Sequence, residues 1–175
     1  MKQLPTKFLS RKEAEDITAT YNAGIMYSST VPYGKKIAIV SMVSPPEMGE
    51  DHDAAVTKLE GFWFKALKLQ FQDIDPTHCS PEWIAAHKPM TDEHAQQVID
   101  FLLEVENEVD EIWTHCEAGI SRSAAVSKFI ASIYGSPFPD DYRHYNQHVF
   151  STLRRVHAIA GLHGKLVPGL KGGLS

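Results

Sequence analysis

Apolar residues fall along this chain in two kinds of pattern, short continuous or alternating runs and longer stretches with helical spacing. Residues 36–43 are a continuous β-branched run that stops before Pro45, which is typical of a strand buried on both faces. Residues 65–72 alternate between apolar and polar side chains, which predicts a second strand. The apolar run over residues 109–114 predicts a third.

Helices are predicted between these strands from their start signals. The expected starts are Ser10, which forms a capping box with Glu13, Ser80 with Pro81 after it, Thr91, Ser123, and Asp140. Residues 91–105 have an apolar stripe, and Gly135 is the expected C-cap of the helix that ends at Tyr134. Strands that alternate with helices predict an α/β fold with a central, mostly parallel, twisted sheet flanked by helices in three layers. Functional loops are then expected at the carboxyl ends of the strands.

Length and composition predict a single domain over residues 1–175 with a full core. Within it, residues 1–35 are interpreted as an N-terminal extension packed on the domain, and the Gly-rich residues 165–175 as a flexible tail. The net charge of -5 and the lack of a long basic run argue against nucleic acid or a membrane surface as a partner. Two cysteines and no signal-like or membrane-length apolar segment favour the cytoplasm. The oligomeric state stays open.

The segment from His115 to Ser123 carries the most informative chemistry. It places the Cys116 thiol and the Arg122 guanidinium at the two ends of a short loop, between a predicted strand and a predicted helix. A helix N-terminus leaves main-chain N–H groups unpaired and favours anions, and Gly119 permits a tight turn there. A guanidinium can bind two oxygens of a tetrahedral anion at once, and the same positive field favours a thiolate. The pattern predicts an anion cradle with a nucleophile inside it.

The pattern His-Cys, five residues, Arg-Ser resembles the phosphate-binding loop of the cysteine-dependent protein tyrosine phosphatase superfamily. The Ala118–Gly119 pair and Ser123 are most similar to its dual-specificity branch. The resemblance implies a protein tyrosine phosphatase-like fold, with Cys116 as nucleophile and Arg122 as phosphate clamp. It also implies a phosphate loop made of Glu117, Ala118, Gly119, Ile120, Ser121 and Arg122, supported by His115 and by a Ser123 hydrogen bond to the sulfur.

The activity implied by the resemblance is hydrolysis of phosphomonoesters on phosphoproteins through a cysteinyl-phosphate intermediate. Phosphotyrosine is the expected substrate, with phosphoserine and phosphothreonine also open, and small aryl phosphates should react too. No metal and no cofactor are expected, because Arg122 and the loop amides would stabilise the phosphate oxygens.

This chemistry also needs a general acid to protonate the leaving oxygen. In the resembled family the acid is an aspartate on a loop after an upstream strand. Asp73 follows the alternating strand and is the favoured candidate, with Asp75 as the alternative. Residues 76–89 make the interval before Cys116 longer than the resemblance leads one to expect, and a lid over the site is one interpretation of them.

Two other functions remain open from the sequence. A rhodanese-type sulfurtransferase also uses a cysteine in an anion-binding loop but needs no general acid. A catalytically silent phosphate-binding module would bind a phosphopeptide and release no phosphate.

Two further groups of polar residues flank the predicted site residues in sequence. His78, Cys79 and His87 match no common zinc spacing, so no metal site is predicted, while a redox pairing of Cys79 with Cys116 stays open. Residues 143–148 are interpreted as a solvated helix face rather than a border of the site.

Overall fold

The centre of the molecule is a four-stranded parallel sheet. The structure is a computed structural model that describes residues 3–24, 34–46 and 57–162. Its strands are β1 (Thr6–Ser10), β2 (Ile37–Val43), β3 (Lys65–Gln70) and β4 (Glu111–Cys116), in the order β1-β4-β2-β3. All three strand pairings are parallel, so the carboxyl ends of the strands meet at one edge of the sheet.

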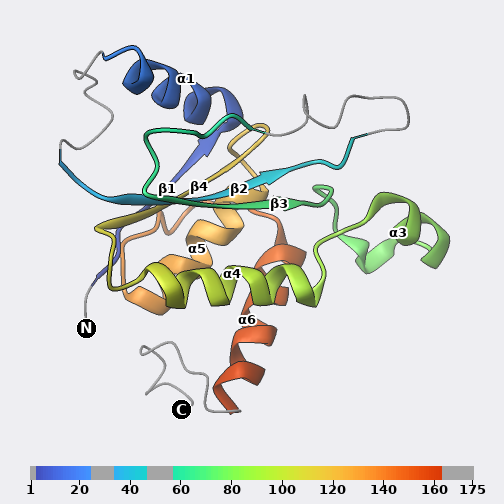
Figure 1. Cartoon of the computed structure of the whole chain (residues 1–175). Helices are drawn as coiled ribbons and strands as arrows, with labels where there is room; N and C mark the ends of the chain where they lie inside the picture. Colours follow the sequence, from blue (N-terminus) through green and yellow to red (C-terminus); the bar gives the residue numbers. More distant parts are fainter. Residues whose placement is uncertain (1–2, 25–33, 47–56, 163–175) are drawn as a thin grey trace.

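Helices cover both faces of this sheet, as Figure 1 shows. Helix α1 (Arg11–Asn22) lies on one face, and α4 (Asp92–Val105), α5 (Arg122–Tyr134) and α6 (Gln147–Leu162) lie on the other. The predicted three-layer α/β fold with a parallel sheet is therefore confirmed. None of the helices in the described ranges combines the length and apolarity that crossing a bilayer requires.

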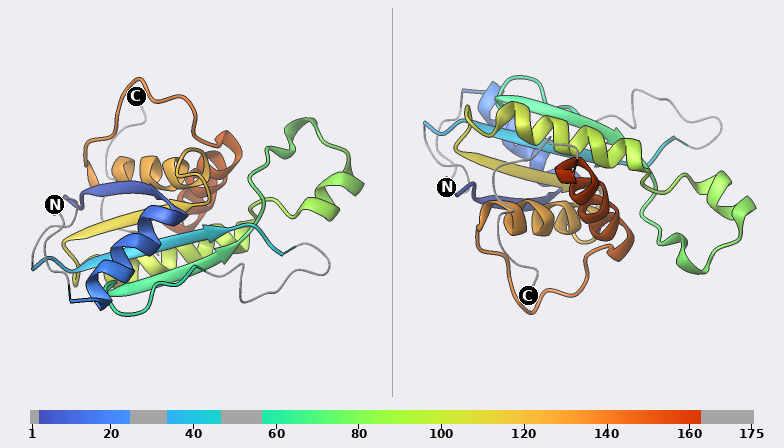
Figure 2. Two further views of the ribbon diagram at one scale, coloured as in Figure 1. Left: turned by 90° about the horizontal axis from the view of Figure 1, so that it is seen from above. Right: turned by 90° about the horizontal axis from the view of Figure 1, so that it is seen from below.

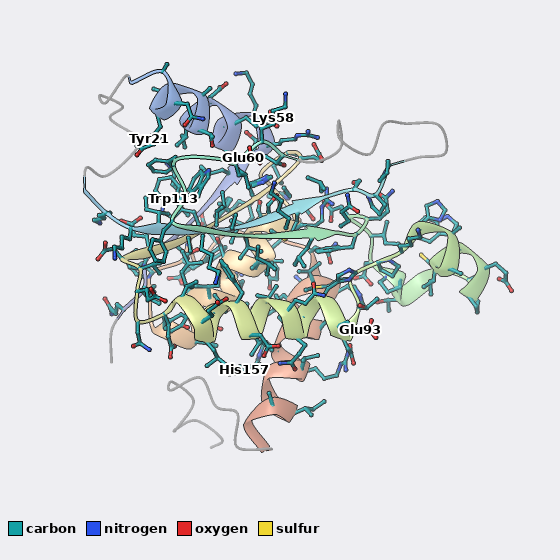
Figure 3. The ribbon with its side chains drawn as sticks, viewed as in Figure 1. Tyr21, Lys58, Glu60, Glu93, Trp113 and His157 are labelled. Atoms are coloured by element: carbon teal, nitrogen blue, oxygen red, sulfur yellow. The ribbon has the colours of Figure 1, made fainter. Side chains whose placement is uncertain are left out.

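Each face of the sheet has its own apolar core. The larger core joins the sheet to α4, α5 and α6 and includes Met42, Leu69 and Phe129. The smaller core, under α1, contains Trp63 and Trp113, whose ring centroids are 5.8 Å apart in an edge-on arrangement. Trp113 is labelled on this face in Figure 3. Burial of large side chains such as these contributes about 1.5–3 kcal/mol each, so both cores hold β4 in place.

The N-terminal segment, interpreted from the sequence as an extension, supplies both β1 and α1. Residues Thr6 to Ser10 pair with Ile112 to Cys116, which makes β1 the edge strand beside β4. Helix α1 begins at the predicted capping box, in which the Ser10 side chain accepts a hydrogen bond from the main-chain N–H of Glu13. The strand and cap together bring the start of α1 next to the end of β4.

The last helix begins at Gln147, later than the predicted start at Asp140. The side-chain oxygen of Asn146 accepts a hydrogen bond from the main-chain N–H of Val149, at 3.0 Å, and so caps the helix. Residues ahead of this cap are held outside the helix, because the Tyr142 hydroxyl donates to the carbonyl oxygen of Ile120 at 2.7 Å. The predicted tail, residues 165–175, lies outside the described residues.

Candidate active site

Cys116 occupies the last position of β4, where the strand gives way to the loop before α5. Its side chain is 2% exposed, and its sulfur lies 3.2 Å from the hydroxyl oxygen of Ser123 in the first turn of α5. The thiol and the helix N-terminus are thus brought together by a loop of residues 117–121. The contact between Cys116 and Ser123 is the one expected from the sequence.

Neighbouring elements hold this loop by its carbonyl oxygens. Three bonds do so: the main-chain N–H of Arg11 donates to Glu117 at 3.2 Å, the Tyr142 hydroxyl to Ile120, and the main-chain N–H of Asn146 to Ser121 at 3.2 Å. These bonds use acceptors of the loop and none of its donors. The loop is therefore fixed from the start of α1 and from the segment before α6.

Gly119 allows the loop to pass directly against the junction of β1 and α1. Its φ angle is +71°, a left-handed conformation that side chains rarely adopt. A Cβ atom at this position would lie 2.4 Å from the main-chain nitrogen of Ser10 and 2.6 Å from the carbonyl carbon of Leu9. Both the backbone angle and the close approach require glycine.

Arg122 is buried, with 3% of its surface exposed. Its Nη1 donates to the carbonyl oxygen of Phe71 at 2.6 Å, and its Nε lies 3.9 Å from Asp73 Oδ2. Nε is buried and makes no hydrogen bond with any described residue. Buried donors without partners are rare in native proteins, so this atom calls for an acceptor that a bound anion would supply.

Asp73 lies against the loop, three residues beyond the end of β3. Its Oδ1 accepts hydrogen bonds from the Ser121 hydroxyl and from the Asn146 amide, both at 2.8 Å. The side chain is 34% exposed, so solvent still reaches it. Asp73, Ser121 and Arg122 are brought together by these contacts although β4 and α4 separate them along the chain.

Asp75, the alternative acid, makes a local turn. Its Oδ1 accepts from the main-chain N–H of Thr77 at 3.0 Å and from the Thr77 hydroxyl. Asp75 thereby caps the short 3-10 helix η1 (Pro76–His78). Asp73, by contrast, contacts the loop of residues 117–121 through Ser121.

Two aromatic residues near the thiol, His115 and Tyr142, have shifted pKa values. Burial lowers the pKa of His115 to about 4, an effect only partly offset by the adjacent main chain of Cys116, so the ring is neutral at physiological pH. Neither ring nitrogen of His115 makes a hydrogen bond of ordinary geometry with the described residues. Burial, followed by the electrostatic interaction with Cys116, raises the pKa of Tyr142.

The outer rim of the loop is exposed. Glu117 and Ala118 face solvent, and Ile120 is 50% exposed. The Glu117 carboxylate pairs with the Arg11 guanidinium at 3.7 Å.

The segment interpreted as a lid, residues 76–89, projects away from the sheet edge in both views of Figure 2. Its helix α3 (Pro81–His87) has no buried residue. Trp83 stacks on His87 with ring centroids 3.9 Å apart, and the Cys79 thiol donates to the carbonyl oxygen of Asp75 at 3.5 Å. The side chain of His78 lies outside the described residues. Among the side chains that are described, no three His, Cys, Asp or Glu residues converge as metal ligands would.

Asn146 is the site residue that sequence reasoning missed. It is 8% exposed and contacts Asp73 and Ser121, instead of lying on a solvated helix face. The sequence signal for it is that asparagine is a preferred N-cap residue, and its side chain here accepts a hydrogen bond from Val149, three residues later. Asp140 and Asp141 are also good helix-start residues, so the sequence predicts the start of the last helix at Asp140 and not after Asn146.

No family model matches the sequence, and no curated protein matches it. Among solved structures, the chain is similar to the crystal structure of a mouse protein, provisionally described as a dual specificity phosphatase, in complex with zinc tungstate. The two are 13% identical, and the alignment covers 91% of this chain and 86% of that one with a TM-score of 0.49.

Proposed function

We propose that this chain is a phosphomonoester hydrolase that acts on phosphoproteins through a cysteinyl-phosphate intermediate, in the manner of the superfamily that its loop resembles. The observation that carries the proposal is the buried Arg122 at the helix N-terminus that follows Cys116. Its Nε makes no hydrogen bond within the described residues, and its Nη1 is held by Phe71. A phosphate bound there would satisfy the orphaned donor and accept hydrogen bonds from the loop amides.

In the first step, the Cys116 thiolate attacks phosphorus in line with the leaving oxygen. The sulfur–phosphorus bond forms as the phosphorus–oxygen bond breaks, and the carboxylic acid of Asp73 gives its proton to the leaving oxygen. Arg122 and the loop amides stabilise the charge on the three other phosphate oxygens. The contacts of Asp73 with Ser121 support its assignment over Asp75.

In the second step, water attacks the phosphocysteine and the Asp73 carboxylate takes a proton from it. The sulfur–phosphorus bond breaks, inorganic phosphate leaves, and the sulfur departs as a thiolate. The Ser123 hydroxyl, 3.2 Å from the sulfur, can donate a hydrogen bond that stabilises this leaving thiolate. The step returns Cys116 and Asp73 to their starting forms.

The test is hydrolysis of a generic aryl phosphate, in chelator, by the wild type, Cys116→Ser and Asp73→Asn. We expect turnover by the wild type, none by Cys116→Ser, and a rate reduced by roughly 10²-fold or more in Asp73→Asn. Turnover by Cys116→Ser would refute the covalent route. Full activity of Asp73→Asn with loss in Asp75→Asn would move the acid to Asp75, and full activity of both would remove both aspartates from the acid role. Absence of phosphate release by the wild type would favour the sulfurtransferase alternative. Phosphopeptide binding without phosphate release would indicate a silent binding module.

A further inference from the structure

Asn146 joins three parts of the molecule that are far apart in sequence. Its main-chain N–H donates to Ser121 O of the phosphate loop at 3.2 Å, and its side-chain NH₂ donates to Asp73 Oδ1 at 2.8 Å. Its side-chain oxygen accepts from the N–H of Val149 at 3.0 Å, within α6. The cap of α6 orients the amide, and the amide in turn orients the carboxylate.

Asp73 needs such a support because it begins an exposed segment, residues 73–88, which we call the excursion. The two ends of this segment come together at a point that we call the neck. The neck is closed by a hydrogen bond from the N–H of Gln72 to the carbonyl oxygen of Lys88 at 3.0 Å. Lys88 has the left-handed φ of 43°, and helix α3 inside the excursion buries no residue. Because α3 buries none of its residues, the position of Asp73 depends on contacts at the neck.

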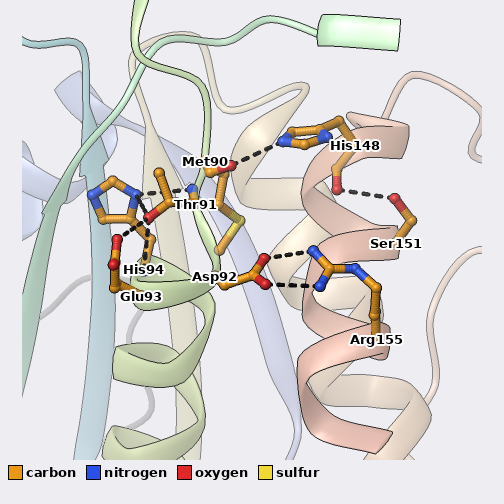
Figure 4. Close-up of polar contacts among 8 residues, drawn as sticks. All are labelled: Met90, Thr91, Asp92, Glu93, His94, His148, Ser151 and Arg155. Atoms are coloured by element: carbon orange, nitrogen blue, oxygen red, sulfur yellow. Dashed lines mark hydrogen bonds and ion pairs between the residues drawn. The ribbon is translucent and has the colours of Figure 1, made fainter. Parts of the chain in front are cut away.

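Helix α6 also holds the returning leg of the excursion. Figure 4 shows the contact between His148 Nε2 and the carbonyl oxygen of Met90, at 2.9 Å, and the two hydrogen bonds of Arg155 to the Asp92 carboxylate. The same helix therefore holds one leg at Asp73, through Asn146, and the other at Met90. These contacts make the start of α6 a rigid reference for the neck.

We propose that Asn146 is a positioning residue that holds the Asp73 side chain at the phosphate loop for proton transfer. The inference rests on the proposed function and adds a residue to it. Proton transfer requires the acid within hydrogen-bond reach of the leaving oxygen, and misplacement of about 1 Å can cost 10²-fold in rate. Asn146 acts through Asp73, so its loss affects the step in which the leaving oxygen is protonated.

The experiment compares Asn146→Ser with the wild type on two substrates, nitrophenyl phosphate and phenyl phosphate. Serine keeps an oxygen that can cap α6 but removes the amide donor to Asp73, so folding is preserved. Phenolate is the poorer leaving group and depends more on the acid. We expect Asn146→Ser to lower kcat/KM for phenyl phosphate by about tenfold or more and for nitrophenyl phosphate by much less. Ser151→Ala, one turn along α6, is the matched control and should change neither rate.

A double variant separates positioning from a general structural role. In the Asp73→Asn background, Asn146→Ser should have no further effect on phenyl phosphate, because the acid it positions is already lost. Equal losses on both substrates, or an additive loss in the double variant, would overturn the inference. If Asp73→Asn is impaired on phenyl phosphate and Asn146→Ser is not, the proposed function stands and this inference falls. If Asp73→Asn is unimpaired, the acid assignment falls and takes the inference with it.

Discussion

Arg122 Nη1 donates to the carbonyl oxygen of Phe71 at 2.6 Å, across 51 positions of sequence. This bond ties the Arg122 guanidinium to the chain just two residues before Asp73. The groups proposed to bind the phosphate and to protonate its leaving oxygen are thus set relative to each other by main-chain as well as side-chain contacts. The same bond orients the planar guanidinium, whose buried Nε makes no hydrogen bond with the described residues.

The geometry at Arg122 predicts that lysine cannot replace it. Lysine has one ammonium group, which cannot donate to Phe71 and also present a planar pair of donors to an anion. We expect Arg122→Lys to lower kcat/KM for an aryl phosphate by about 10²-fold. Arg154→Lys, at an exposed position of α6, is the control and should retain the wild-type rate. Comparable rates in the two variants would argue against the clamp.

Ser123 predicts a separable effect on the second step. Its hydroxyl is aimed at the sulfur, and loss of a hydrogen bond to a charged group costs about 1.5–3 kcal/mol. With nitrophenyl phosphate, Ser123→Ala should release the first equivalent of nitrophenol rapidly and then turn over roughly tenfold or more slowly. Rapid-mixing kinetics detect this burst. Ser132→Ala, at an exposed position of the same helix, is the control and should give wild-type kinetics. Slower turnover of Ser123→Ala without a burst would contradict the proposed role of Ser123 in stabilising the leaving thiolate.

Gly119 and Gly135 give a matched pair for testing the close approach of the loop. Both have positive φ, +71° and +64°, but a Cβ at Gly135 meets nothing within 4 Å, whereas one at Gly119 collides with the backbone of Ser10. Alanine at either position incurs backbone strain of about 1–3 kcal/mol, and only Gly119→Ala adds the clash. Denaturant unfolding should show Gly119→Ala to be the less stable variant. Equal free energies of unfolding would contradict the described contact with β1.

Because His115 is buried and neutral, we predict that the protein loses stability as the pH falls. Its pKa is about 4 in the folded protein against an ordinary value of 6.5, so the unfolded chain binds the proton first as the pH falls. Stability should therefore decline from about pH 6.5 to about pH 4, by roughly 3 kcal/mol from this residue. His115→Gln lacks the titration. The free energy of unfolding of the wild type minus that of the variant should therefore fall as the pH is lowered through this range. A difference that does not depend on pH would refute the prediction.

The fold class was predictable because the strands β2, β3 and β4 and the helices α4 and α5 carry strong periodic or capping signals. Strand β1 was not, since only Leu9 of its five residues is buried and no alternation is visible. It becomes a strand because β4 offers it an edge to pair with. Long-range pairing of this kind leaves no local pattern.

The site was predictable where its residues are neighbours in sequence. Cys116, Arg122 and Ser123 lie within one strand–loop–helix unit, so their spacing fixes their geometry. Asn146 meets Asp73 across 73 positions, and only the tertiary structure brings them together. The direction of the excursion, away from the sheet edge, could not be predicted either, because the sequence gives only the length of this segment.

The central claim is that Cys116 receives the phosphoryl group, and acid quenching tests it directly. The wild type is mixed with an aryl phosphate, quenched within the first turnover, digested and analysed by mass spectrometry. We predict a phosphoryl adduct on the peptide that carries Cys116, enriched in Ser123→Ala and absent from Cys116→Ser. Turnover without an adduct in either active protein, together with hydrolysis by Cys116→Ser, would contradict the covalent mechanism.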